Sequence, residues 1–269
     1  MTTHPAPTSR TATVDLLRVA VHASADEAGR AAASVVAAAL RRRLARAGEA
    51  RVVFAAAPSQ DAVLHALRAE PDIDWSAVTA FQMDEYVGLG DEHPQAFGTY
   101  LDDHIYGAVR PGRVHKMRPA GSGQAEADRY AALLAQAPID VVCLGIGENG
   151  HIAFNDPGTA DFEDPLAVKV VELDHASRVQ QVNDGCFATV DEVPTHAVTV
   201  TVPALLAAAT VVGSVSGTRK RDAVRRSLFG AIGTDCPASA LRGHPNGWLF
   251  LDPDATPDEF MSVDPVKVE

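Results

Sequence analysis

Residues 139–158 read Ile-Asp-Val-Val-Cys-Leu-Gly-Ile-Gly-Glu-Asn-Gly-His-Ile-Ala-Phe-Asn-Asp-Pro-Gly, and this stretch carries the strongest structural signal in the chain. The apolar run from Ile139 to Leu144 is long enough for a strand buried on both faces, as in a parallel sheet. Glycines at 145, 147 and 150 follow, where the chain must turn tightly or approach a ligand. His151 and Asp156 come next, the latter in a strong turn signal. An imidazole and a carboxylate therefore follow a buried strand, where open parallel sheets bind their ligands.

The same glycines fit a second interpretation. Gly145-x-Gly147-x-x-Gly150 is formally a dinucleotide fingerprint, and Glu172 lies about 20 residues further on, where a ribose-binding acid would lie. That fingerprint requires a long helix starting within the glycines, but the turn signal at 155–158 ends any helix there after about two turns. The sequence therefore predicts no nicotinamide or flavin, and no other cofactor.

Outside this stretch, strand patterns alternate with helix patterns along most of the chain. Strands are predicted at residues 16–21, 51–56, 78–83, 168–173, 197–202, 210–215 and 248–251. Helices are predicted at residues 24–48, 59–68, 95–106, 123–135 and 219–228. This alternation predicts an α/β fold, a three-layer α/β/α sandwich with a mostly parallel, Rossmann-like sheet. Residues 1–12 are predicted to be a disordered tail and residues 13–269 a single domain.

Composition excludes several classes of partner. The chain has 269 residues, of which 46% are hydrophobic and 22% charged, as in ordinary globular proteins. No apolar run approaches the ~18 residues of a membrane span, so no membrane partner is expected. A net charge of -12 argues against nonspecific binding of nucleic acid. Three widely spaced cysteines fit a reducing, cytoplasmic location and no metal site.

Four loops follow predicted strands, at residues 57–60, 84–93, 147–158 and 217–220. In a parallel sheet, all four open onto the same edge. The second loop begins with Asp84-Glu85, of which one side chain is expected to face a pocket, because neighbours in an extended chain point in opposite directions. That carboxylate is either a general base or part of a solvated turn. The fourth loop places a helix start beside Arg219 and Lys220, which is either an anion site or a solvated basic face.

Two long motifs resemble one enzyme family. The segment from Phe81 to Leu89, with His93-Pro94, resembles the Met-Asp-Glu-Tyr segment of glucosamine-6-phosphate deaminases. Residues 145–157 resemble their Gly-His-Ile-Ala-Phe-Asn-Glu-Pro loop, and the later Gly217-x-x-Lys220 agrees in order and spacing. The resemblance covers nearly the whole chain after the tail. It implies a metal-free aldose–ketose isomerisation with loss of ammonia, which converts glucosamine 6-phosphate and water into fructose 6-phosphate and ammonia.

The resemblance also implies a role for each matching residue. Asp84 matches the base that moves a proton between C2 and C1, and His151 matches the acid/base that opens the sugar ring. Asn149 and Asp156 match the acidic positions that flank and tune the histidine. The family often has Asp at the first of these and Glu at the second. Asp156, one methylene shorter, is expected to hold His151 less closely, and an Asn cannot stabilise a charged imidazole.

The larger departures concern the phosphate. The family's phosphate loop reads Gly-Gly/Ser-Thr-Pro, whereas residues 56–60 here read Ala-Ala-Pro-Ser-Gln, and Pro58 removes an N–H donor. A phosphate-binding arginine of the family falls on Asn183, and Arg178 is the predicted substitute. We therefore predict a divergent member with an altered phosphate site. The predicted substrate-binding residues are Ser59, Gln60, Glu85, Gly147, Gly150, Arg178 and Lys220.

Three alternatives stay open. A sugar-phosphate isomerase that never releases ammonia fits the same motifs. A 6-phosphogluconolactonase resembles the family, but its Gly-His loop continues Thr-Ala-Ser, unlike residues 152–155. A non-catalytic sugar-phosphate sensor would need a DNA-binding domain, for which the segment before Leu16 is too short. The expected partner is a small sugar phosphate, used in cytoplasmic N-acetylglucosamine catabolism, and the resemblance allows a homo-oligomer.

Overall fold

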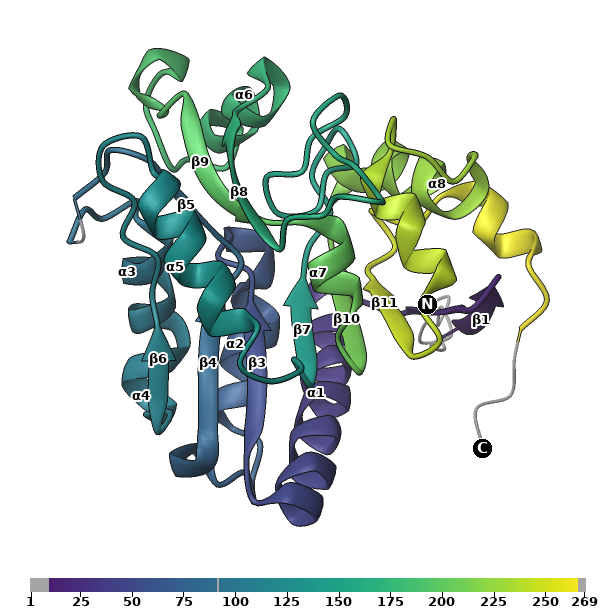
Figure 1. Cartoon of the computed structure of the whole chain (residues 1–269). Coiled ribbons are helices and arrows are strands. Elements are labelled where there is room, and N and C mark those ends of the chain that lie inside the picture. Colours follow the sequence, from purple (N-terminus) through teal and green to yellow (C-terminus); the bar gives the residue numbers. More distant parts are fainter. Residues whose placement is uncertain (1–9, 91, 266–269) are drawn as a thin grey trace.

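An eight-stranded sheet forms the centre of the computed structural model, which describes residues 10–90 and 92–265 (Figure 1). In spatial order its strands are β1 (Arg10–Val14), β2 (Leu17–Val21), β11 (Gly247–Leu251), β10 (Thr210–Val215), β7 (Val141–Leu144), β3 (Ala50–Phe54), β4 (Val78–Gln82) and β6 (Arg113–His115). All neighbouring strands pair in parallel except β1 and β2, which are antiparallel. The predicted mostly parallel sheet is confirmed.

Helices cover both faces of this sheet. Val52 of β3 packs in the apolar cluster that contains residues of α1 (Ala25–Ala47) and α2 (Asp61–Arg68), whereas Val53 packs in the cluster that contains residues of α5 (Gln124–Leu134), α7 (Val202–Leu206) and α8 (Arg221–Phe229). This alternation explains why β3 and β7 are buried at every position. The helices are α1 (Ala25–Ala47), α2 (Asp61–Arg68), α3 (Phe97–Leu101), α4 (Gly107–Val109), α5 (Gln124–Leu134), α6 (His175–Asn183), α7 (Val202–Leu206) and α8 (Arg221–Phe229). The three-layer α/β/α architecture is therefore confirmed.

The long helix α1 begins and ends where the sequence predicts. Ser24 caps it, because the Ser24 hydroxyl accepts the backbone N–H of Glu27 at 3.2 Å. Gly48 ends it in the left-handed region, with φ of 74°. Within the helix, a Cβ on Gly29 would lie 2.5 Å from the Cβ of Ala62, so this glycine lets α1 and α2 pack closely.

A second, smaller sheet lies beyond the carboxyl ends of the main strands (Figure 1). It contains β5 (Asp84–Tyr86), β9 (His196–Val200) and β8 (Val168–Glu172), paired antiparallel in that order. The alternation of elements had placed the strands at 168–173 and 197–202 in one main sheet, and this is wrong. β5 follows β4 directly, and the N–H of Val200 donates to the carbonyl of Met83 at 2.8 Å, which holds the small sheet over the edge of the large one.

Several boundaries also differ from the predictions. Residues 10–12, predicted as part of a disordered tail, belong to β1, because the turn at Asp15 (φ of 53°) folds β1 back on β2; residues 1–9 lie outside the described residues. Strand β6 and helices α6 and α7 were not predicted. The helix predicted at 95–106 begins at Phe97 and passes through a π-helical turn into α4. Among the described residues, no helix is long and apolar enough to span a membrane.

Candidate active site

The four loops predicted to share one edge of the sheet line a single pocket. They follow β3, β4, β7 and β10, all at the carboxyl ends of the strands. Each loop contributes at least one predicted side chain or glycine to the pocket wall: Ser59, Asp84, Gly147, His151 and Lys220. The parallel sheet therefore brings together groups that are far apart in the sequence.

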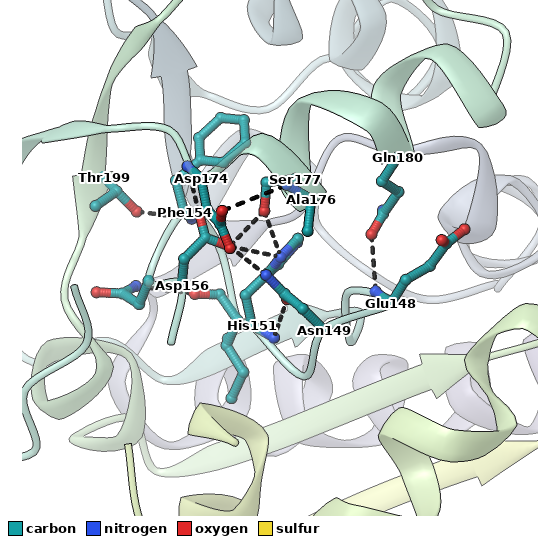
Figure 2. Close-up of polar contacts among 12 residues, drawn as sticks. Glu148, Asn149, His151, Phe154, Asp156, Asp174, Ala176, Ser177, Gln180 and Thr199 are labelled. Carbon is teal, nitrogen blue, oxygen red and sulfur yellow. Dashed lines mark hydrogen bonds and ion pairs between the residues drawn. The ribbon is translucent and has the colours of Figure 1, made fainter. Parts of the chain in front are cut away.

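His151 is the centre of a buried hydrogen-bond network (Figure 2). Its Nδ1 lies 3.0 Å from Oδ1 of Asp156 and 2.9 Å from the hydroxyl of Ser177, and that hydroxyl donates to the same Asp156 oxygen. A carboxylate without a proton can only accept, so Nδ1 carries the hydrogen. In the described part of the chain Nε2 has no hydrogen-bond partner, and the ring lines the pocket. The free ring nitrogen is therefore available to a substrate.

Asp156 is fully buried and nevertheless ionised. Burial raises the pKa of its carboxyl group, but His151 and the hydrogen bonds from Asn149 and Ser177 outweigh burial and lower the pKa to about 2. Asn149 donates to Asp156 through Nδ2 at 2.9 Å and accepts the backbone N–H of His151 through Oδ1 at 3.0 Å. Despite its shorter side chain, Asp156 lies at hydrogen-bond distance from the His151 ring. Asn149 orients this carboxylate and the histidine backbone instead of the imidazole.

The glycines of the loop allow close packing within the protein. A Cβ on Gly147 would lie 2.2 Å from Cε1 of the His151 ring, so the imidazole lies directly over this residue. Gly150 has φ of +91°, and a Cβ there would lie 2.7 Å from Sγ of Cys236. Gly147 lines the pocket, but Gly150 packs against Cys236 and not toward the pocket, so its predicted substrate contact is wrong.

Asp84 and Glu85 point in opposite directions. Asp84 lines the pocket, and burial, with the charge of Glu85, raises the pKa of its carboxyl group well above the usual value. Its carboxylate forms no hydrogen bond with the residues that the structure describes. Glu85 instead accepts the backbone N–H groups of Phe97 at 3.0 Å and Gly98 at 2.9 Å. The prediction that Glu85 binds substrate is therefore wrong, since its oxygens hold the start of α3.

Lys220 is the one predicted cation that faces the pocket. Burial lowers the pKa of its ammonium group, an effect that Asp184 and Glu148 partly offset. Arg219 points elsewhere and pairs with Glu148 at 3.3 Å and Asp184 at 3.4 Å. The N–H of Gly217, at the start of the same loop, donates to the carboxylate of Asp252 at 3.1 Å and is therefore not free to bind an anion. The predicted anion site is thus reduced mainly to Lys220.

The loop after β3 contributes one predicted residue and not the other. Ser59 lines the pocket. Gln60 is buried away from it and donates to the carbonyl of Ser214 at 3.1 Å, which ties the loop to β10. Its predicted substrate contact is wrong. The hydroxyl of Tyr100 donates to the carbonyl of Ala57 at 2.7 Å, so the loop is fixed from outside the pocket as well.

Arg178 does not replace the missing phosphate-binding arginine. Its guanidinium donates to the carbonyls of Val190 at 2.6 Å and Val193 at 3.1 Å, and it does not line the pocket. Other residues of α6 approach the site although the sequence pattern did not indicate them: Ser177, Gln180 and Gln181. Positions three and four apart share one face of a helix, so this set would have been visible had α6 been predicted.

A larger hollow lies elsewhere, between α1, α2 and the turn after α3, with a volume of about 860 Å³. None of the four loops lines it, and most of its lining residues are exposed. The smaller pocket has the convergent polar groups and the shifted pKa values expected of an active site. Among the described residues, no group of three or more His, Cys, Asp or Glu side chains is placed to hold a metal ion.

Known proteins share much of this sequence and fold. A glucosamine-6-phosphate deaminase of Exiguobacterium sibiricum is 37% identical over 186 residues, which are 68% of this chain and 71% of that protein. A solved structure described as a monomeric glucosamine-6-phosphate deaminase superposes with a TM-score of 0.80 and 29% identity, over 88% of this chain and 98% of the other.

A more distant structure shows how far the fold extends. The 6-phosphogluconolactonase of Trypanosoma brucei superposes with a TM-score of 0.72 over 88% of this chain and 96% of the other, but at 17% identity it supports the fold alone. The family model described as glucosamine-6-phosphate isomerases/6-phosphogluconolactonase matches residues 23–250. This chain therefore belongs to the glucosamine-6-phosphate isomerase/6-phosphogluconolactonase family.

Proposed function

We propose that this chain is an amino-sugar-phosphate deaminase that converts glucosamine 6-phosphate, or a close relative of it, into a ketose phosphate and ammonia. One observation carries the proposal: a histidine with a free Nε2, oriented by a buried carboxylate, lines the same pocket as the unpaired carboxylate of Asp84. The reaction needs these two groups because ring opening and proton transfer occur at different parts of the sugar.

His151 opens the ring in this proposal. Its Nε2 takes the proton from the anomeric O1 and delivers a proton to the ring oxygen O5, which leaves C1 as an aldehyde. The ionised Asp156 stabilises the positive charge that the imidazole carries between these two transfers. Ser177 and Asn149 supply the donors that keep this carboxylate in position.

Asp84 then moves the proton. The carboxylate removes the proton of C2 while O1 gains a proton, which gives an enolamine. It then returns its proton to C1 while the nitrogen loses one, so that the C1 aldehyde becomes an alcohol and the C2 amine becomes an imine. Water adds to the imine carbon, and ammonia leaves, which gives the ketose. Burial favours this chemistry, because the raised pKa of Asp84 makes its ionised form a stronger base.

The phosphate end of the site supports divergence from the family pattern. Pro58 provides no N–H, and neither Arg178 nor Gln60 reaches the pocket. Lys220 is therefore the one predicted cation that remains there, together with the hydroxyl of Ser59. We therefore propose a relaxed or altered requirement for phosphate. A kcat/KM of about 10⁴ M⁻¹s⁻¹ or more on glucosamine 6-phosphate would contradict that part of the proposal.

A coupled ammonia-release assay tests the proposal across glucosamine 6-phosphate, galactosamine 6-phosphate and both unphosphorylated amines. Ammonia and ketose in equal amounts from one of them support it. Isomerisation without ammonia favours the isomerase, hydrolysis of 6-phosphogluconolactone favours the lactonase, and tight binding without turnover favours the sensor. Cytoplasmic N-acetylglucosamine catabolism and a homo-oligomeric state belong to the same proposal, and light scattering measures the latter.

A further inference from the structure

Two buried polar side chains line the pocket without a partner of their own. Gln181 is 8% exposed and Lys220 is 7% exposed, and neither forms a side-chain hydrogen bond or ion pair with any residue in the described ranges. Buried amides and ammonium groups are normally satisfied, because each unmet hydrogen bond costs about 1–3 kcal/mol. Both side chains are therefore placed to bind a ligand and not to hold the fold.

Helix α6 places Gln181 between the histidine and the lysine loop. At one end of the helix, Ser177 contacts Nδ1 of His151 at 2.9 Å. At the other end, Arg219, the neighbour of Lys220 in the chain, donates to the carbonyl of Asn183 at 3.3 Å. Gln181 lies one helical turn after Ser177 and on the same face. A hexose phosphate whose C1 end lies at His151 thus extends toward Gln181 and Lys220.

The charges around Lys220 favour a neutral hydrogen-bond donor beside it. Lys220 lies near Glu148 and Asp184, both of which Arg219 already pairs with. Among the described residues that line the pocket, Lys220 is the one lysine or arginine. An amide donates to a phosphate oxygen without adding a second buried cation, and a second buried cation would need its own counter-charge.

We propose that Gln181 binds the phosphate group of the substrate together with Lys220, in place of a second cation. This inference rests on the function proposed above, because it takes the sugar phosphate as the ligand. The side-chain N–H of Gln181 donates to one phosphate oxygen, and the ammonium group of Lys220 neutralises the remaining charge in part.

Replacing the amide tests the proposal directly. Gln181→Met keeps the length of the side chain and removes its donor. A hydrogen bond to a charged group of about 1.5–3 kcal/mol corresponds to a rise in KM for glucosamine 6-phosphate of about tenfold or more. The value of kcat should stay within about threefold, because the contact is equal in the ground and transition states.

Inhibition separates a phosphate contact from a general effect. The Ki of inorganic phosphate should rise by about the same factor, whereas the Ki of unphosphorylated glucosamine should not change. An unchanged Ki of phosphate, or an equal rise for both inhibitors, would overturn the proposal. Gln181→Glu, which puts a negative charge beside the phosphate, should raise the Ki of phosphate further.

The neighbouring glutamine provides a matched control. Gln180 accepts the backbone N–H of Glu148 at 2.8 Å, so Gln180→Met should lower the melting temperature, whereas Gln181→Met should not. A lower melting temperature for Gln181→Met would show a structural role instead. If wild-type protein releases no ammonia, the proposed function fails, but calorimetry with inorganic phosphate on wild type and Gln181→Met still decides the phosphate contact.

Discussion

Asp156→Asn removes one charge from the centre of the site and leaves its shape nearly unchanged. The side-chain oxygen Oδ1 accepts from Asn149, Ser177 and His151, and an asparagine oxygen can take the same place. The second oxygen, Oδ2, accepts a hydrogen bond from the backbone N–H of Asp174 at 3.4 Å, and this bond is lost because the NH₂ group of an asparagine cannot accept it. The substitution therefore tests what the charge itself contributes.

The pKa of Asp156 gives the size of the effect. The value is about 2 in the folded protein against an ordinary 3.8, and this difference corresponds to about 2 kcal/mol of folding free energy at neutral pH. Because the folded pKa lies below the ordinary one, this stability is fully present above about pH 4 and is lost as the pH falls toward 2. Full burial means that solvent does not screen the charge.

Urea unfolding between pH 3 and 8 measures this contribution. We expect Asp156→Asn to be less stable by about 2 kcal/mol from pH 8 to pH 5, with a difference that narrows below about pH 4. Turnover should fall about 100-fold or more, because a neutral partner does not stabilise the charged imidazole. Asp174 is exposed and caps the N-terminus of α6. The substitution Asp174→Asn is the matched control and should change the free energy of unfolding by less than about 0.5 kcal/mol. Equal stability of Asp156→Asn and wild type at pH 7 would refute the reasoning.

Three further predictions concern other parts of the pocket. Gly147→Ala places a Cβ 2.2 Å from the ring of His151, so steady-state kinetics should show a loss in kcat/KM of about 100-fold; unchanged kinetics would mean that the ring can move freely. Tyr100→Phe removes the 2.7 Å hydrogen bond to the carbonyl of Ala57 and should raise KM about two- to tenfold with little change in kcat. Burial raises the pKa of Asp84, so kcat/KM should fall as acid protonates the base, at a pH well above 3.8; a profile flat to pH 4 would contradict this role.

The sequence predicted the main sheet because its signal is local. Apolar runs such as residues 141–144 are buried on both faces, and helices follow them at regular intervals. This local signal does not distinguish the strands of the small sheet from those of the main sheet. β8 and β9 have the same β-branched composition as the main strands, and which sheet a strand joins depends on pairing partners distant in the sequence.

The proposed catalytic residues, Asp84 and His151, were predictable because they belong to two continuous motifs at the ends of strands. Glu85, Gln60 and Arg178 were assigned wrongly because each has a partner that sequence does not reveal: the start of α3, the carbonyl of Ser214, and the carbonyls at 190 and 193. Helix α6 was missed because its residues are mostly polar and it lies over the pocket instead of on the main sheet, so it lacks a strong apolar stripe. The contribution of Gln181 therefore emerged only from the structure.

The most direct test of the central claim is the yield of ammonia and ketose phosphate from glucosamine 6-phosphate with wild-type protein and with Asp84→Asn. Asp84 lines the pocket without a hydrogen bond to its carboxylate among the described residues, so the variant should still bind the sugar phosphate with nearly unchanged affinity. We predict equal amounts of the two products from wild type and none above background from the variant. Turnover by Asp84→Asn at the wild-type rate, or its loss of binding together with turnover, would contradict the assignment of Asp84 as the base.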